Sequence, residues 1–143
     1  MLRLTADLYH QMVAHCLAGL PDEACGLLVG SYGGDEATHL IVTENAAASA
    51  VVYEIAPKEL LAADRQARSL GGDLAGVFHS HTHTDAYPSP TDVAQATDPG
   101  WHYVLVSLRD THPVVRSYRI EDGVITEEPV EVPGLGRPAR GSG

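Results

Sequence analysis

The sequence has few of the features that mark secreted, membrane-spanning or redox-active proteins. Its only cysteines, Cys16 and Cys25, are too few for a disulfide framework and are not spaced as a Cys-x-x-Cys pair. No apolar run is long enough to cross a bilayer, and the N-terminal segment mixes polar with apolar residues, which predicts a helix and not a signal peptide. We therefore expect a cytoplasmic protein without membrane contact, whose cysteines are reduced and buried.

Basic side chains are also scarce. The chain has 9 Lys and Arg against 19 Asp and Glu, which gives a formal net charge of −10 at pH 7. The few cations are scattered and form no basic stripe that could displace counterions from phosphates, so nucleic acid is not expected as a partner. A solvated acidic surface is the simplest interpretation, although such a surface could also steer a basic partner.

The remaining features indicate a single α/β domain. A length of 143 residues suits one core, and no repeat, low-complexity tract or internal linker interrupts the chain. The predicted helices span residues 6–18, 58–70 and 91–97, and the predicted strands span residues 25–32, 38–45, 51–55, 74–81, 102–108, 114–120 and, more weakly, 124–132. We expect a mixed sheet with about three helices over residues 1–132, followed by a flexible Gly- and Pro-rich tail at residues 133–143.

The helix predicted at residues 58–70 is amphipathic. Pro57 stands where the first turn of a helix tolerates proline, and a pair of glycines ends the pattern. We expect its apolar face to pack on the sheet. The apolar residues at helical spacing are Leu60, Leu61, Ala67 and Leu70.

Potential metal ligands are concentrated in HSHTHTDAYPSPTD, residues 79–92. Because side chains alternate along a strand, His79 and His81 project from one face with Cα atoms roughly 6.6 Å apart, so two imidazoles can converge on one ion. They stand at the end of an apolar strand, where open α/β sheets usually form active sites. A lone His-x-His pair, however, is also common on protein surfaces. His83 continues the alternation in a segment that already has loop character, and we predict that it lies at the surface or a pocket rim.

The segment Ser89-Pro90-Thr91-Asp92 has the pattern of a helix start. Ser89 suits the N-cap, Pro90 the first helical position and Asp92 the third, which is nearly a capping box. Capping alone would explain these residues. A helix beginning here would also bring the Asp92 carboxylate back towards the end of the histidine strand. Two His and one Asp make an open zinc site with a fourth position for water, whose pKa zinc lowers to about 7.

The full pattern resembles the signature of the JAMM (MPN+) metallopeptidases. His79-Ser80-His81 is followed after seven residues by Ser89 and, after two more, by Asp92. The family also carries an upstream glutamate before a Gly-containing apolar strand, and Glu23 in PDEACGLLVG fits that context. The order of elements from residue 1 to about 132 is similar as well. The resemblance implies the JAMM/MPN (cytidine-deaminase-like) fold, with a curved mixed β-sheet flanked by helices.

The resemblance also implies a role for each site residue. His79, His81 and Asp92 would bind one zinc ion, and Glu23 would take a proton from the attacking water and pass it to the leaving amine. An apolar setting would raise the pKa of Glu23 towards the working pH. Ser89 would donate a hydrogen bond to the oxyanion, a role that competes with N-capping for the same hydroxyl. Without the histidine motif, Glu23 would be interpreted as a surface acid. Ser80 lies between the two ligands but faces away from them, and we predict a structural role for it.

The resemblance is strongest to the short bacterial branch of the family. That branch includes hydrolases that remove cysteine from the C-terminal glycine of a small ubiquitin-like sulfur-carrier protein, and a related use trims extra residues from the carrier's C-terminus. A flexible glycine tail can enter a narrow groove and pair with a sheet edge. Two further hypotheses remain at this point: a zinc hydrolase of small peptides or amides, and a metal-free MPN-type scaffold.

Overall fold

The computed structural model describes residues 1–134, so residues 135–143 of the predicted tail lie outside the described part of the chain. Within residues 1–134 the helices are α1 (Ala6–Ala18), α2 (Pro57–Ser69) and α3 (Pro90–Gln95). The strands are β1 (Leu2–Arg3), β2 (Cys25–Gly30), β3 (Ala37–Thr43), β4 (Asp73–His81), β5 (His102–Ser107), β6 (Val114–Glu121), β7 (Val124–Glu128) and β8 (Val130–Glu131). The predicted α/β class is confirmed.

Six strands form one mixed sheet in the order β3-β2-β4-β5-β6-β7. The pairing of β4 with β5 is parallel, and the other neighbours in this sheet are antiparallel. The weak strand predicted at residues 124–132 is two strands, since β8 leaves the main sheet and pairs in parallel with β1. The two-residue strand β1 was not predicted, because so short a segment carries no periodicity.

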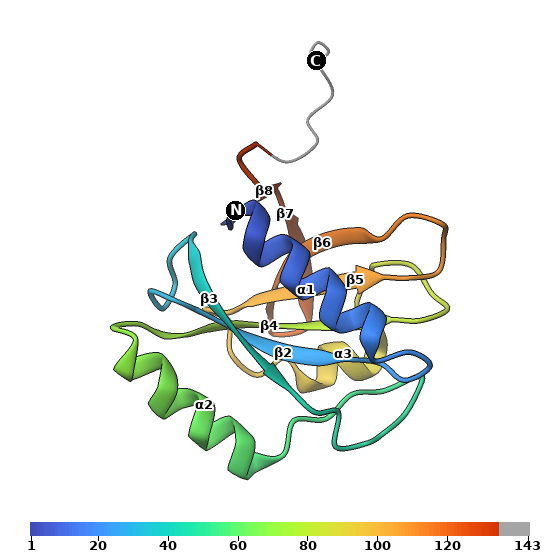
Figure 1. Ribbon diagram of the computed structural model, residues 1–143, viewed down its shortest axis with the longest axis horizontal. Helices are drawn as coiled ribbons and strands as arrows, with labels where there is room; N and C mark the ends of the chain where they lie inside the picture. Colours follow the sequence, from blue (N-terminus) through green and yellow to red (C-terminus); the bar gives the residue numbers. More distant parts are fainter. Residues whose placement is uncertain (135–143) are drawn as a thin grey trace.

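Helices cover both faces of the sheet (Figure 1). On one face, Leu8, Met12 and Cys16 of α1 pack against Phe78 and other apolar side chains of the central strands. The helix begins as predicted, with Oγ1 of Thr5 accepting a hydrogen bond from the N–H of Leu8. On the other face, α2 and α3 pack over a second cluster that includes Val77. Residues of opposite parity on β4 therefore point into different cores, as the alternation predicts.

Helix α2 packs on the sheet through smaller side chains than expected. Ala63 and Ala67 are its buried residues. The leucines predicted to pack there are largely at the surface: Leu60 is 37% exposed, Leu61 53% and Leu70 43%. Alanines allow the helix backbone to lie close to the sheet, and this close approach leaves the longer leucine side chains at the edges of the contact.

Residues 51–55 do not form the predicted strand. They belong to a loop between β3 and α2 that crosses the edge of the sheet near the ends of β2 and β4 (Figure 1). β-branched and aromatic residues favoured a strand here, but several backbone groups of this segment are hydrogen-bonded by the side chains of Asn45 and Ser49. A loop satisfied in this way needs no neighbouring strand.

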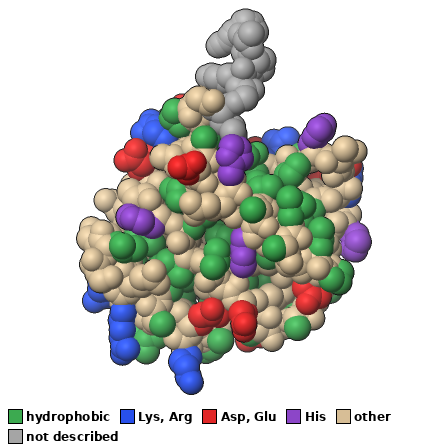
Figure 2. Space-filling model, viewed as in Figure 1, with side chains coloured by type: hydrophobic (Ala, Val, Ile, Leu, Met, Phe, Trp, Pro, Cys, Tyr) green, Lys and Arg blue, Asp and Glu red, His purple; other side chains and the backbone are tan. Residues whose placement is uncertain are grey.

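The described residues contain no helix that is both long and apolar enough to cross a membrane. Cys16 and Cys25 are free and buried, as predicted. Figure 2 shows one face of the molecule, on which the few Lys and Arg side chains of the described residues lie near the edge and form no continuous basic patch. The scattered cations of the sequence therefore remain scattered on this face of the folded chain.

Candidate metal centre

Two histidines and one aspartate converge at the carboxyl end of β4. Nε2 of His81 lies 2.9 Å from Oδ2 of Asp92, and Nε2 of His79 lies 3.5 Å from Oδ1 of the same carboxylate. One ligand atom from each of the three side chains lies within 4.8 Å of the other two. Two ligands held at about 2.0–2.1 Å by a tetrahedral zinc ion are roughly 3.3 Å apart, so the three donors have the spacing and the chemistry that one ion requires.

Neighbouring groups orient both histidine rings. Nδ1 of His81 lies 2.7 Å from the backbone carbonyl oxygen of Asp85, which can only accept a hydrogen bond. Nδ1 therefore carries the proton, which directs Nε2 towards the site, the usual arrangement for a metal-binding histidine. The ring of His79 stacks on Tyr53 with centroids 4.1 Å apart and planes inclined by 22°. Both rings are thus held in place by groups outside the donor set.

Glu23 reaches the same site from the segment before β2. Its side chain is 4% exposed, and Oε1 lies 3.5 Å from Nδ1 of His79. Neither of these two buried atoms has a hydrogen-bond partner among the described residues. Leaving a buried polar atom unpaired costs on the order of 1–3 kcal/mol, so such pairs in native proteins usually mark a functional site or a bound water or ion. The unpaired carboxylate beside the donor set suits a site that handles water and a cation.

The contact between His81 and Asp92 shifts the pKa values of both groups. Burial alone would lower the pKa of His81, but hydrogen bonds to Asp92 and to the Asp85 carbonyl outweigh it and raise the pKa. Burial would raise the pKa of Asp92, but the hydrogen bond with His81 and the neighbouring His79 lower it. Both shifts favour the charged forms of the pair. A cation bound here would have to displace the second proton of a charged His81, the one on Nε2.

Ser89 and Asp92 form a reciprocal cap at the start of α3. Oγ of Ser89 accepts a hydrogen bond from the N–H of Asp92 at 3.1 Å, and Oδ2 of Asp92 accepts one from the N–H of Ser89 at 2.8 Å. The cap uses a lone pair of the serine hydroxyl and leaves its O–H free to donate. The two roles expected to compete for Ser89 therefore use different parts of the hydroxyl. The cap also fixes the carboxylate that faces the histidines.

Several other polar residues near the motif lie outside the cluster. His83 is exposed. Ser80 points to the opposite face of β4, where its Oγ accepts a hydrogen bond from the N–H of Ala24 at 2.8 Å, which agrees with a structural role. Cys25 is paired with His79 in the strand register, but its Sγ contacts Thr43 and burial raises the pKa of its thiol. His102 lies elsewhere, hydrogen-bonded to Glu128 and to the carbonyl of Gly34.

Sequence reasoning missed three residues that border the site. Tyr53 was assigned to a strand, and Asn45 and Thr82 were not singled out. Oγ1 of Thr82 donates to the carbonyl of Ala50 at 2.9 Å, which ties the loop between β3 and α2 to the histidine segment. Asn45 ends the strand predicted at residues 38–45, and an Asn followed by small residues is a turn signal that could have indicated this loop.

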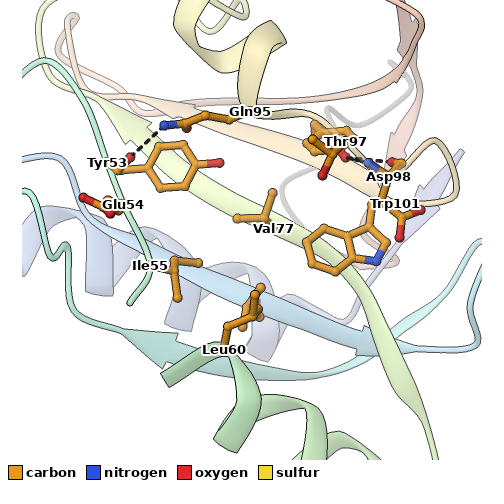
Figure 3. Close-up of a pocket in the computed structure, with 11 residues that line it drawn as sticks. Tyr53, Glu54, Ile55, Leu60, Val77, Gln95, Thr97, Asp98 and Trp101 are labelled. Atoms are coloured by element: carbon orange, nitrogen blue, oxygen red, sulfur yellow. Dashed lines mark hydrogen bonds between the residues drawn. The ribbon is translucent and has the colours of Figure 1, made fainter. Parts of the chain in front are cut away.

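A cavity of about 420 Å³ adjoins the centre on the face covered by α2 and α3 (Figure 3). Tyr53, which stacks on His79, forms one wall, and Val77 lies two residues before His79 on the same side of β4. Nε2 of Gln95 lies 3.4 Å from the carbonyl oxygen of Tyr53, at the top of the view. The full lining consists of Leu27, Tyr53, Glu54, Ile55, Leu60, Val77, Gln95, Thr97, Asp98, Trp101 and Tyr103.

Comparison with known proteins places this geometry in context. The family model of prokaryotic homologs of the JAB domain matches residues 5–121. The "CysO-cysteine peptidase" of Mycobacterium tuberculosis is 47% identical over 133 residues, which cover 92% of this chain and 91% of that protein. The "Desampylase" of Haloferax volcanii is 34% identical over 111 residues, covering 74% of this chain and 80% of that protein.

Solved structures are similar over the same region. A protein of Desulfitobacterium hafniense, solved in solution, has a TM-score of 0.83 and 35% identity, and the match covers 92% of each chain. A JAB1/MPN domain protein from Archaeoglobus fulgidus has a TM-score of 0.55 and 23% identity, with 91% of this chain and 98% of that chain covered. The second similarity concerns the fold alone.

Proposed function

Because this chain belongs to the prokaryotic branch of the JAB/MPN domain family, we propose that it is a zinc-dependent peptidase acting at the C-terminus of a small ubiquitin-like protein. The observation that carries the proposal is the buried Glu23 carboxylate, 3.5 Å from a histidine whose other ring nitrogen faces Asp92. Relatives named as peptidase and desampylase support a hydrolase. We expect the protein to act in the cytoplasm.

The metal would be held by His79, His81 and Asp92, one ion per chain. Zinc bound by two histidines and a carboxylate lowers the pKa of water to about 7 and polarises carbonyl oxygens. The ring orientation that Asp85 imposes on His81, and Tyr53 on His79, prepares the two Nε2 atoms before the ion arrives. Preorganised ligands bind more tightly because less freedom is lost on binding.

The proton transfers would fall to Glu23. Its carboxylate would take a proton from the attacking water as the new C–O bond forms. The same proton would pass to the nitrogen of the leaving amine as the C–N bond breaks. A positioned acid–base group of this kind typically contributes on the order of 10²–10⁴ in rate. The free O–H of Ser89 would donate to the substrate carbonyl oxygen as it gains negative charge.

The substrate we favour is a ubiquitin-fold sulfur carrier whose C-terminal glycine carries a cysteine or a short extension. A tail ending in glycines has no side chains to obstruct its approach to the buried centre. The cavity beside His79, whose lining is apolar and aromatic in larger part, offers walls against which the preceding tail residues would pack. Identity to a CysO-cysteine peptidase supports release of cysteine, whereas identity to a desampylase supports cleavage after a ubiquitin-like protein.

The test combines metal analysis with a defined substrate. The chain is purified, its zinc content is measured by elemental analysis, and it is incubated with a ubiquitin-fold carrier ending in Gly-Gly-Cys. A free peptide with the same C-terminal sequence is tested in parallel, and products are identified by mass spectrometry. We expect one zinc per chain and release of free cysteine from the carrier. Equal cleavage of the free peptide would instead indicate a hydrolase of small peptides, and absence of stoichiometric zinc would indicate a scaffold.

Glu23→Gln should retain zinc and lose about 10²-fold or more in kcat, because the amide cannot take up the proton. His79→Ala and Asp92→Ala should lose both zinc and activity. Asp22→Asn is the matched control, since it makes the same change of charge one residue away and should remain active. Full activity of Glu23→Gln under saturating zinc would disprove the assignment of Glu23 as general base.

A further inference from the structure

A single side chain, that of Asn45, organises the loop that crosses the metal centre. Its amide nitrogen, which carries two N–H groups, lies within hydrogen-bond distance of three backbone carbonyl oxygens, those of Glu23 at 2.9 Å, Ser49 at 3.3 Å and Val52 at 2.9 Å. Its amide oxygen accepts from two backbone N–H groups, those of Ala47 and Glu54, each at 3.0 Å. If the amide were flipped, its oxygen would lie against backbone carbonyl oxygens, with no donor between them. The neighbouring groups therefore fix the positions of the amide nitrogen and oxygen.

The loop also hydrogen-bonds to the backbone of Glu23, the residue assigned as general base. Glu23 precedes β2 and is not part of the strand ladder. Its carbonyl accepts from Asn45, and its N–H donates to the carbonyl of Ser49 at 2.8 Å. Both backbone hydrogen-bonding groups of Glu23 are therefore held by residues 45–49. Among the described residues, this loop takes the place that a paired strand would have in fixing a backbone.

The same loop also touches the metal-binding segment. Its carbonyl at Ala50 accepts from Thr82, the residue after His81, and its Tyr53 stacks on His79. One loop thus contacts the segment of the general base and the segment of the proposed ligands. Its conformation depends on Asn45, which bonds to residues at both of its ends.

We propose that Asn45 is a positioning residue that sets the distance between the Glu23 carboxylate and the metal centre by holding the backbone of Glu23. This inference rests on the proposed function, in which Glu23 transfers the proton. Asparagine suits the task because one planar group offers both donors and acceptors. An aspartate of the same shape would keep the two bonds from Ala47 and Glu54. It would, however, turn an acceptor towards three carbonyls.

The first test measures how strongly the backbone N–H of Glu23 is protected from exchange, and it does not depend on enzymatic activity. Amide hydrogen exchange is measured by NMR on the metal-free chain for the wild type, Asn45→Asp and Ser117→Ala. We expect the N–H of Glu23 to lose at least tenfold in protection in Asn45→Asp. Ser117→Ala is the control, because it removes a buried hydrogen bond to Glu128 at 2.6 Å, on strands away from the site, and should leave Glu23 protected.

The second test is a double-mutant cycle on kcat, measured at saturating zinc and saturating carrier substrate. Asn45→Asp should lower kcat at least tenfold in the wild-type background with zinc content unchanged. In the Glu23→Gln background, Asn45→Asp should lower kcat less than twofold, because the carboxylate through which Asn45 acts is already absent. Equal losses in both backgrounds would show a merely structural role and would overturn the proposal.

If Asn45→Asp does not fold, Thr82→Val releases the same loop more mildly and should give a smaller loss with the same dependence on Glu23. Unchanged Glu23 protection in a folded Asn45→Asp would also overturn the proposal. The exchange test remains decisive if the wild type hydrolyses no carrier, so failure of the proposed function and failure of this inference are distinguishable.

Discussion

Ser89 meets two demands with one hydroxyl group. It caps α3, and the cap holds Asp92 at 2.9 Å from His81. Under the proposed function, its O–H also donates to the substrate. The two roles can be separated because N-capping tolerates glycine, which costs only a few tenths of a kcal/mol, whereas alanine costs about 1 kcal/mol.

We predict that Ser89→Gly and Ser89→Ala lose similar activity but differ in stability. Both lack the donor, so kcat should fall on the order of 10²–10³-fold in each. Only Ser89→Ala should lose about 1 kcal/mol in the free energy of unfolding, measured by urea titration. If Ser89→Gly keeps wild-type kcat, the hydroxyl serves the cap alone.

At the scale of elements, the centre depends on how closely β4 lies beside β5. The two strands are parallel neighbours, with Gly76 opposite His102 and His79 opposite Leu105. A Cβ on Gly76 would lie 2.5 Å from the carbonyl oxygen of His102, closer than a side chain can approach a backbone atom. Glycine is therefore required here to keep β4, and the histidines at its end, in register with β5.

We predict that Gly76→Ala lowers the free energy of unfolding by about 1–3 kcal/mol, since the added methyl must push two backbones apart. Thermal unfolding followed by circular dichroism should show a Tm lower by roughly 5–10 °C. Ser69→Ala, at the exposed end of α2, is the control and should change the free energy by less than about 0.5 kcal/mol. A Tm for Gly76→Ala equal to that of the wild type would mean that the strands are farther apart than described.

At the scale of the whole molecule, a buried charge network joins the C-terminal strands away from the metal centre. Glu128 of β7 accepts hydrogen bonds from His102 of β5 at 2.7 Å and from Ser117 of β6 at 2.6 Å. Burial alone would raise the pKa of Glu128, but the hydrogen bonds from His102, from the N-terminal ammonium of Met1 at 2.8 Å and from Ser117 lower it from 4.5 to about 2. A carboxylate whose pKa is lowered by folding stabilises the fold at pH values above its pKa in the unfolded chain. This contribution is lost as the pH falls through its pKa in the folded chain.

We predict that Glu128→Gln lowers the free energy of unfolding at pH 7 by on the order of 3 kcal/mol, the equivalent of the pKa shift. The difference in the free energy of unfolding between wild type and variant should become smaller as the pH falls from about 4.5 to about 2, because the wild-type carboxylate becomes protonated over this range. Urea unfolding of both metal-free proteins across this range measures the gap, and titration of the metal ligands cancels in the difference. A constant gap would show that Glu128 contributes through packing and not through charge.

The sequence by itself determined the features that depend on neighbouring residues. Alternation along one strand placed His79 and His81 on a common face, and the Ser89–Asp92 spacing specified a cap whose carboxylate points back to them. The helix boundaries at Thr5 and Pro57 followed from local backbone chemistry in the same way. Such features involve atoms only a few residues apart, so their geometry is largely set by the chain itself.

Only the tertiary structure decided how distant segments meet. Glu23 and His79 are brought within 3.5 Å by the antiparallel pairing of β2 with β4, which no local pattern specifies. Residues 51–55 have strand-forming side chains, yet they form a loop because the side chains of Asn45 and Ser49 bond its backbone and the ring of Tyr53 packs on a histidine. Contacts of this kind depend on the free energy of the whole packed molecule, and for these residues it outweighs local preference.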